Sequence, residues 1–372
     1  MAKSILHIIN SLDQGGAQNI LLNLCKYTPH HKHHIVYLTQ GSFYVSSFQS
    51  IGIDPVLIEV KPRNFIAASF FLFRYIKKLK PFAVQTWLYH SDLIGGIVSR
   101  LAGIKNISWG VHHSDHTFST SKISTLLTVC LAACLSHFIP KNIIYCALTA
   151  KNFHERIFFS KHKSRVIFNG YDADEFRISH AQRELFRSKF CIPSDALVFG
   201  VAARFHPVKD HKTVFHALSI LKSYGLVFTL VLAGEKITQD NSSLLELIDN
   251  FDLRQDTILL GSYDSMNTFY NSIDILLLSS VSEAFPNVVF ESLLAGTVCV
   301  CTNVGDLYQV VPLKPYLTSI SQPSRFADHI SNLLSDMTNQ VSNISPKTVR
   351  NYALQNFSAR HMSTLYSEVW HL

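Results

Sequence analysis

Two carboxylates, Glu283 and Glu291, lie eight positions apart in the apolar stretch VSEAFPNVVFESLLAG, residues 281–296. The preceding apolar run, 274–279, indicates a buried strand, followed by a polar loop and a helix that begins near Asn287. Glu283 then lies in the loop and Glu291 one turn inside the helix, beside apolar residues. Such an acid is costly unless it accepts hydrogen bonds, which the hydroxyls of a sugar or a ribose would donate. The alternative, which spacing leaves open, is a loop acid and a solvated helical acid.

A pair of cations follows another apolar run. In GVAARFHPVKDHKTV, residues 200–214, Arg204 ends the expected strand and Lys209 falls at the start of the next helix. Both side chains would project beside the positive end of that helix, an arrangement that suits a diphosphate. Two surface cations in a loop are the alternative.

A glycine pair, Gly15 and Gly16, separates the apolar run 5–9 from a helical stretch in INSLDQGGAQNILLNL. Glycines allow a backbone to approach a ligand closely, and the free N–H groups of the helix favour an anion. The stretch lacks GxGxxG and an acidic residue closing a following strand, which counts against NAD binding. A turn that uses glycine only for its geometry is the alternative.

The elements that must position these residues alternate regularly along the chain. Short β-rich apolar runs and segments of helical period follow one another, which predicts parallel sheets flanked by helices. The rhythm restarts after the Asn-Gly turn in FNGYDADEF, residues 168–176, so we expect an α/β fold of two Rossmann-like doubly wound domains. Ligands of such sheets bind where strands end. The expected strands lie at 5–9, 34–38, 54–60, 82–86, 106–111, 143–148, 165–168, 196–203, 227–234, 256–261, 274–279 and 297–303.

Composition limits the class of protein. The chain has 372 residues, 47% of them hydrophobic and 16% charged, yet no apolar run reaches the length of a membrane span. The best candidate, 126–139, is expected to be a buried helix. The first sixteen residues lack the apolar region of a signal peptide, so a cytoplasmic protein is expected.

Cysteine and histidine usage predicts neither disulfides nor a metal site. Seven cysteines include no CxxC pair, and those at 130, 134, 299 and 301 are expected to be buried structural thiols. The cluster HHKHH at 30–34 is expected on a solvated loop. The formal charge of +7 favours an anionic partner such as phosphates or an acidic lipid surface, whereas no pattern typical of nucleic-acid binding is present.

Taken together, these motifs resemble a known family. The E-x7-E element SEAFPNVVFE, the cations upstream, GGAQ near the N-terminus and NGYDADEF at the hinge are similar to those of the retaining GT-B-fold glycosyltransferases of family four. The resemblance covers nearly the whole chain in the family's order. It implies two domains facing each other across a cleft: an acceptor-side domain at 1–170, a nucleotide-sugar-binding domain at 171–356, and a final helix at 357–372 that packs back on the first domain.

The resemblance also implies roles, carried over by position. Glu291 would bind the ribose, Glu283 the transferred sugar, and Arg204 with Lys209 the diphosphate, so that neither a metal nor another cofactor is needed. A histidine at the end of ISWGVHHSDH would orient the sugar. The catalytic residues implied are Glu283, His113 (favoured over its neighbour), His112, Arg204 and Lys209. The nucleotide-sugar-binding residues implied are Gly15, Gly16, Arg204, Lys209, Glu235, Gly261, Tyr263, Glu283, Phe285, Asn287, Val288 and Glu291.

The expected function is that of a retaining hexosyltransferase. It would move a sugar from a UDP- or GDP-sugar to a glycan or lipid-linked glycan acceptor in surface polysaccharide or lipopolysaccharide synthesis. A nucleotide-sugar epimerase and a non-catalytic family member that acts as a binding subunit are the alternatives.

A basic, aromatic-rich helix at 64–80 offers a possible contact with an anionic inner leaflet. The protein would then be peripheral at the membrane face. A core-facing helix with a solvated basic end is the other interpretation.

Overall fold

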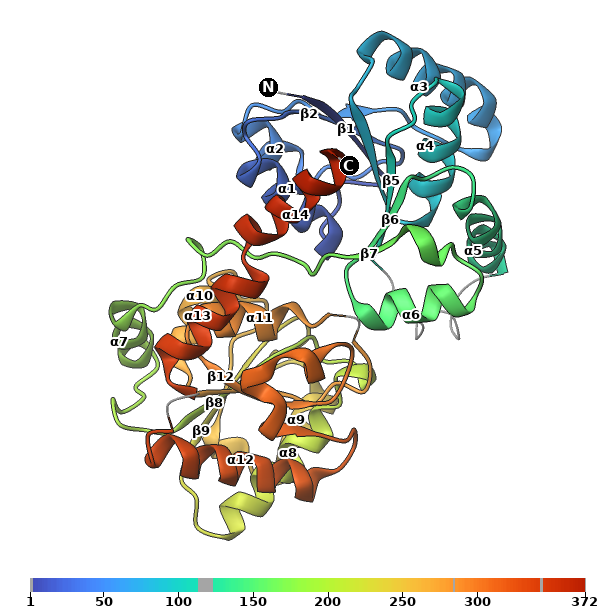
Figure 1. The fold of residues 1–372 in the computed structure, drawn as a ribbon. Helices are drawn as coiled ribbons and strands as arrows, with labels where there is room; N and C mark the ends of the chain where they lie inside the picture. Colours follow the sequence, from blue (N-terminus) through green and yellow to red (C-terminus); the bar gives the residue numbers. More distant parts are fainter. Residues whose placement is uncertain (1–2, 113–122, 284, 342–343, 372) are drawn as a thin grey trace. The chain divides into compact units, whose positions relative to one another are not determined.

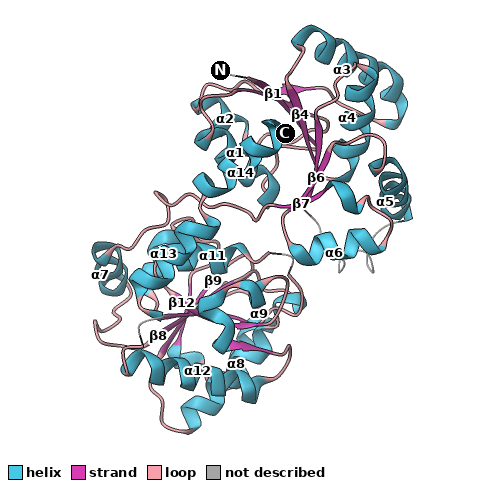
Figure 2. Ribbon diagram, in the orientation of Figure 1, coloured by secondary structure: helices cyan, strands magenta, loops and turns pink. Residues whose placement is uncertain are grey.

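The computed structural model describes residues 3–112, 123–283, 285–341 and 344–371 (Figure 1). The chain divides into two compact units, Met1–Tyr171 with Phe357–Leu372, and Asp172–Asn356. Each unit contains a parallel sheet with helices packed on its faces (Figure 2). The predicted α/β class, with two Rossmann-like domains, is confirmed.

The sheet of the first unit has seven parallel strands in the order β3-β2-β1-β4-β5-β6-β7. The order reverses between β1 and β4, so the carboxyl ends of these two strands border the crevice at which such sheets bind ligands. The predicted strands fall on the observed ones, although β3 is much shorter than the run 54–60. The strands are β1 (Ser4–Ile9), β2 (Lys32–Tyr37), β3 (Val56–Leu57), β4 (Ala83–Trp87), β5 (Ile107–Val111), β6 (Asn142–Tyr145) and β7 (Ser164–Val166).

The helices of the first unit cover both faces of this sheet. Helices α3, α4 and α5 share one flank, where α4 contacts both of its neighbours, and α1 contacts α14 on the other flank (Figure 2). None of the helices in the described part of the chain has the length and apolar character that a membrane crossing requires. The helices are α1 (Gly16–Tyr27), α2 (Val45–Ser50), α3 (Phe65–Leu79), α4 (Tyr89–Leu101), α5 (Ile123–Ser136), α6 (Leu148–Arg156) and α14 (Ala359–His371).

The second unit has six parallel strands in the order β10-β9-β8-β11-β12-β13. The edge strand β13 has only two residues, too few to give a period, and the sequence did not predict it. The strands are β8 (Val198–Ala202), β9 (Thr229–Ala233), β10 (Thr257–Leu259), β11 (Ile275–Leu278), β12 (Val298–Thr302) and β13 (Leu317–Thr318). The helices are α7 (His180–Lys189), α8 (His211–Ser223), α9 (Ser242–Asp249), α10 (Met266–Ser272), α11 (Asn287–Leu294), α12 (Pro323–Thr338) and α13 (Pro346–Phe357).

Helix α14 completes the core of the first unit. The buried side chains Met362, Tyr366 and Val369, which share one face of the helix, pack against β1, α1 and β4. Trp370 is fully buried beside them, and its carbonyl oxygen accepts a 2.7 Å hydrogen bond from the Asn106 side chain. The first unit is therefore assembled from two segments that are far apart in the sequence.

A chain of hydrogen bonds runs through buried imidazoles under α14. Trp87 Nε1 lies 3.3 Å from His7 Nδ1, His7 Nε2 lies 3.0 Å from His33 Nδ1, and His33 Nε2 lies 3.0 Å from the carbonyl oxygen of Thr28. An indole N–H can only donate and a carbonyl can only accept, so the protons must run in one direction along the chain. Each ring is therefore neutral, with one donating and one accepting nitrogen.

The prediction that segment 30–34 lies on a solvated loop is wrong for two of its histidines. His31 and His33 are only 6% and 8% exposed, because β2 begins at Lys32 and directs alternate side chains toward the core. Trp370 covers both imidazoles, with ring centroids 5.8 and 6.1 Å away.

Two further predictions about burial are wrong. Helix α5 is not a buried helix, since Leu127 and Leu131 are 67% and 50% exposed. Cys130 and Cys134 on the same helix are exposed, although Cys299 and Cys301 are buried as expected. An apolar helix with no polar stripe does not show by its sequence which side faces the core.

The buried histidines make the stability of the first unit depend on pH. Burial lowers the pKa of His33 to about 4 and that of His31 to about 4, and lowers the pKa of His7 well below its usual value. Protonation therefore favours the unfolded state. We expect full stability above about pH 6.5 and a loss as the pH falls toward 4, on the order of 3 kcal/mol from His33 alone.

Tryptophan fluorescence measures this effect in one unit, because all three tryptophans, Trp87, Trp109 and Trp370, belong to the first unit. The denaturant midpoint of the wild type should be lower at pH 5 than at pH 7.5, and the exposed-site control His162→Gln should show the same difference. The difference should be smaller for His33→Gln, because this variant has lost one of the buried imidazoles. Equal midpoints at the two pH values in the wild type would contradict the prediction.

Candidate functional site

The loops after β8, β9 and β10 are fastened together at the carboxyl edge of the second sheet. The Phe205 N–H donates to the Glu235 carbonyl at 2.9 Å, and the Gly234 N–H donates to the Gly261 carbonyl at 2.7 Å. A Cβ at Gly234 would lie 2.3 Å from the Ala203 carbonyl oxygen, so only glycine fits there. The backbone that carries Arg204 is thereby fixed against the neighbouring loops.

Lys209 and Glu283 meet at this edge. The Lys209 ammonium donates a short hydrogen bond to Glu283 Oε1, which also accepts one from the Ser280 hydroxyl at 2.7 Å. The two side chains come from the loops after β8 and β11, which are neighbouring strands. The structure thus brings together a cation and an acid that the sequence places 74 residues apart.

The end of β11 holds the lysine loop in place. The Ser279 hydroxyl lies 3.0 Å from the carbonyl oxygen of Lys209 and 2.8 Å from that of Asp210, and the Val281 N–H donates to the Val208 carbonyl at 2.9 Å. Asp210 has a positive φ of 46° and caps α8, where its carboxylate accepts from the Thr213 hydroxyl at 2.7 Å. This bend directs Lys209 toward Glu283 before the helix begins.

Arg204 lies two residues after the end of β8, and its side chain is exposed. Within the described ranges its guanidinium makes neither a hydrogen bond nor an ion pair. The site therefore has one neutralised cation, Lys209, and one cation that is available to an anionic ligand.

Glu291 lies inside α11, which begins at Asn287 as predicted. Its Oε2 accepts a 2.7 Å hydrogen bond from the Tyr270 hydroxyl at the end of α10. Burial raises the pKa of Glu291 to about 7, more than the Tyr270 hydrogen bond lowers it. The carboxylate is thus costly to ionise until further donors reach it.

The remaining residues predicted on α11 lie at its first turn. Phe285 is buried, and its ring stacks on Phe290 at 4.0 Å between centroids and 5° between planes. Asn287 and Val288 are the first two residues of the helix and are half-buried. The stacked rings fix the entry of the chain into α11, so the amides of its first turn face a defined place.

Three predicted residues lie farther along the sheet edge. Glu235 is exposed after β9. The ring of Tyr263 packs edge-to-face on Phe186 of α7, with centroids 6.2 Å apart, so its side chain serves packing and only its backbone is offered at the edge. Gly261 has a positive φ of 68°, which its glycine identity permits.

The predicted residues of the first unit lie at the carboxyl edge of its own sheet. Gly15 caps α1 and Gly16 begins it, where a Cβ on Gly15 would lie 2.5 Å from Gln18 Oε1. His112 follows β5 and stacks on Trp87 at 5.1 Å and 22°. His113, the favoured histidine, lies outside the described residues.

One group in the described part of the chain has the spacing of metal ligands: His7, Cys25 and His33, whose ligating atoms lie within 4.8 Å of one another. Metal binding to these imidazoles would need lone pairs that the hydrogen-bond chain uses, because Trp87 donates to His7 and His7 donates to His33. Burial also raises the pKa of the Cys25 thiol. The hydrogen-bonded state of this group therefore competes with metal binding.

Sequence reasoning missed two residues of the site. Tyr270 and Ser280 supply hydroxyl donors to Glu291 and Glu283. A tyrosine at the end of a buried helix has the pattern of a core residue, and a serine after a strand has that of a loop residue. The packing of α10 on α11 reveals the role of Tyr270, and the bend of the loop after β11 reveals that of Ser280.

Two family models match this chain, one for each half. Residues 14–175 match the family described as Glycosyltransferase Family 4, and residues 182–352 match the family described as Glycosyl transferases group 1. Together the matched segments contain nearly all the site residues named above.

Curated relatives cover most of the chain at low identity. EpsF of Bacillus subtilis (strain 168), described as a glycosyltransferase, is 23% identical over 312 residues, which are 81% of this chain and 79% of that protein. The UDP-Gal:alpha-D-GlcNAc-diphosphoundecaprenol alpha-1,3-galactosyltransferase of Escherichia coli is 22% identical over 297 residues, 77% of this chain and 74% of that protein.

A solved structure is similar over the whole length. HepE from Anabaena in complex with UDP has a TM-score of 0.85 and 17% identity, covering 99% of each chain. At this identity the likeness shows the fold, which is that of the GT-B glycosyltransferases.

The half-buried Glu291 leads to a prediction about protein stability. Its folded-state pKa is above the usual value, so ionisation destabilises the folded protein increasingly as the pH rises from the usual pKa of 4.5, and the full cost is reached above about pH 7. Glu291→Gln keeps the shape and removes that cost. We expect a free energy of unfolding higher by about 1–3 kcal/mol at pH 8 and little changed at pH 5.

Chemical denaturation of the second unit, monitored by hydrogen exchange of its strands, measures this difference. Glu246→Gln on the exposed face of α9 is the matched control and should change stability at neither pH. A Glu291→Gln protein that is less stable at pH 8 than the wild type would contradict the prediction.

Proposed function

Because this chain is a GT-B glycosyltransferase, with a family 4 match in its first half and a group 1 match in its second, we propose that it transfers a hexose from a UDP- or GDP-sugar with retention of configuration. The observation that carries this proposal is the ion pair of Lys209 and Glu283 at the carboxyl edge of the second sheet, with the exposed Arg204 on the loop that also carries Lys209.

The donor binds by exchanging partners at this edge. The diphosphate draws Lys209 and Arg204 to its oxygens, and Glu283 is then free to accept from a hydroxyl of the transferred sugar. The ribose hydroxyls donate to Glu291, which gains the hydrogen bonds that its buried position lacks. The amides at the start of α11 and the backbone at 261–264 complete the site for sugar and base.

The chemistry is stabilisation of a leaving diphosphate. As the glycosidic bond breaks, negative charge grows on the diphosphate, and Lys209 with Arg204 stabilises it more strongly than in the ground state. The leaving phosphate oxygen takes the proton of the acceptor hydroxyl, which attacks the same face of the sugar. The two cations thus fill the role that a metal ion has in other transferases, and we propose that the enzyme needs no metal or other cofactor.

The first unit provides the acceptor side. We assign Gly15 and Gly16 at the start of α1, together with His112 or His113, to recognition of the acceptor and the sugar. The relatives described as a diphosphoundecaprenol galactosyltransferase and as the O-antigen biosynthesis glycosyltransferase WclY of Escherichia coli support a glycan or lipid-linked glycan acceptor in polysaccharide synthesis. HepE, solved with UDP-glucose, supports a UDP-sugar donor.

We also propose contact with an anionic membrane through α3, the helix expected at 64–80. Ile66 and Phe70 are 84% and 56% exposed, although their spacing also fitted a core-facing helix. The same helix ends in the exposed cations Arg74, Lys77 and Lys78. An apolar face that adjoins cations suits a leaflet of anionic lipids.

A thermal-shift panel of nucleotides and nucleotide sugars tests the proposed donor. We expect UDP or GDP, and one of their sugar derivatives, to raise the melting temperature of the protein. The increase should persist in the presence of EDTA, because no divalent cation is proposed to be needed. Conversion of the sugar nucleotide without an acceptor would indicate the epimerase instead. Binding with no transfer to any glycan acceptor would indicate a non-catalytic subunit.

Lys209→Ala should lower kcat by about a hundredfold or more while leaving nucleotide affinity within about tenfold, since the lysine acts chiefly on charge that develops in the transition state. Lys212→Ala, which removes an exposed cation three residues away on α8, is the control and should leave both constants unchanged. Steady-state kinetics with the donor found in the panel, and calorimetric titration of UDP, provide the two measurements. A normal kcat in Lys209→Ala would remove the lysine from the mechanism.

A further inference from the structure

Helix α5 exposes an apolar face that lacks any charge. Leu127 and Leu131 are 67% and 50% exposed, and Cys130 and Cys134 lie on the same side of the helix. No Lys, Arg, Asp or Glu occurs from residue 123 to residue 140. A solvated helix ordinarily has charged residues on its outer face, so α5 has the outer face of a helix that meets something apolar.

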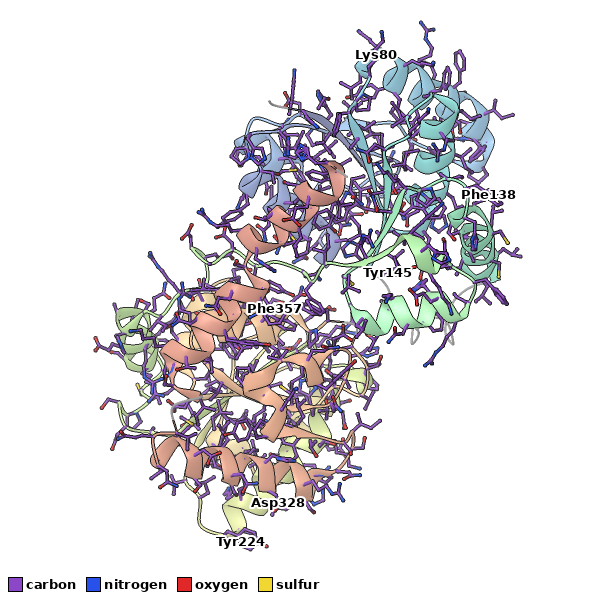
Figure 3. All side chains as sticks on the ribbon, viewed as in Figure 1. Lys80, Phe138, Tyr145, Tyr224, Asp328 and Phe357 are labelled. Carbon is purple, nitrogen blue, oxygen red and sulfur yellow. The ribbon has the colours of Figure 1, made fainter. Side chains whose placement is uncertain are left out.

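The apolar surface continues past the end of α5. Phe138 lies at the outer edge of the first unit (Figure 3) and is 75% exposed. Phe158 is 82% exposed, and its carbonyl oxygen is 3.0 Å from His137 Nε2. Phe158 has a positive φ of 72°, an uncommon conformation for an aromatic residue, and this conformation presents the ring to solvent.

Two cations bind backbone carbonyl oxygens at the C-terminal end of α5. The Arg100 guanidinium donates to the carbonyl oxygens of Phe138 and Ile139 at 3.0 and 2.8 Å. The Lys163 ammonium donates to the carbonyl oxygens of Ser136 and His137 at 3.0 and 2.6 Å. Both side chains are thus held at the end of α5, where the macrodipole also favours them.

The helical layer that contains α5 has a strongly one-sided charge. Helices α3, α4 and α5 contain four Lys and Arg against a single acid, Asp92, which is only 1% exposed. The whole first unit has 19 Lys and Arg against 7 Asp and Glu, a formal +12, whereas the second has 14 against 19, a formal −5. The layer therefore attracts an anionic surface and repels a second copy of itself.

The apolar face of α5 suits the membrane–water interface and not a position across the bilayer. Helix α5 has 14 residues, which corresponds to a length of about 21 Å, too short to cross the apolar core of a membrane. Helices α3 and α5 flank α4 in one layer, so their exposed apolar residues share one side of the first unit (Figure 1).

We propose that α5, with Phe138 and Phe158, is a second lipid anchor that inserts shallowly into an anionic leaflet while Arg100 and Lys163 contact lipid phosphates. The apolar side chains of α5 enter the acyl boundary, and the cations remain at the headgroups. This inference deepens the proposed contact through α3 and rests on that contact, but it does not depend on the sugar or the nucleotide transferred.

Co-sedimentation with vesicles tests the proposal. Wild-type protein should bind vesicles of phosphatidylcholine with phosphatidylglycerol, and bind pure phosphatidylcholine vesicles much more weakly. Leu127→Glu/Leu131→Glu should weaken binding to the anionic vesicles by about tenfold or more, because two exposed leucines no longer enter the acyl boundary. Val227→Glu, at a position 86% exposed in the second unit, is the control and should bind like the wild type.

Two further readouts distinguish the outcomes. Transfer to a water-soluble acceptor should be unchanged in the double variant. Wild-type protein that binds anionic vesicles but transfers no sugar would count against the proposed function and not against this surface. Ile66→Glu/Phe70→Glu tests α3 separately. If only that variant loses binding, the α5 anchor is refuted and the α3 contact stands.

A fluorophore on α5 reports insertion directly. In Cys130→Ser/Cys191→Ser, Cys134 is the exposed thiol that remains, and an environment-sensitive label there should shift to the blue with anionic vesicles and resist an aqueous quencher. A label that stays fully quenched on bound vesicles would overturn the proposal. A wild-type dimer in solution that the leucine double variant converts to a monomer would also overturn it, since the face would then bind a second copy.

Discussion

The contact between Lys209 and Glu283 joins the loops of two neighbouring strands, and the rest of the candidate donor site depends on it. Strand β11 supports both partners, because Ser279 and Ser280 at its end hold the lysine loop and the glutamate respectively. Because Glu283 holds the Lys209 ammonium, the lysine side chain does not fold onto another part of the protein surface. The unliganded site is therefore already arranged for a ligand with a negative centre and hydroxyl groups around it.

At Glu291, the cost of burial outweighs the hydrogen bonding. Its hydrogen bond with Tyr270 does not offset its burial, and the pKa is raised to about 7 as a result. A residue that costs stability in the free protein is retained where a ligand relieves the cost. Stability and binding are therefore opposed at this position.

Much of the fold was predictable, because strands that are buried on both faces appear as apolar runs between helical segments. The start of α11 at Asn287 was predictable for the same reason, and the placement of Glu291 followed from it. The side-chain contacts were not predictable: Lys209 and Glu283 meet from loops 74 residues apart, and Tyr270 reaches Glu291 from a neighbouring helix. Nor was the exposure of α5, since a helix that is apolar on all sides gives the sequence no direction toward the core.

The first unit is discontinuous, and this has a consequence for biosynthesis. Its last helix, α14, contributes Trp370 to the core, yet every residue of the second unit is translated before it. The usual order, in which the N-terminal domain folds first on the ribosome, is therefore reversed here. The second unit emerges whole, while the first waits with an open seam along β1 and α1 until the ribosome releases the segment that closes it.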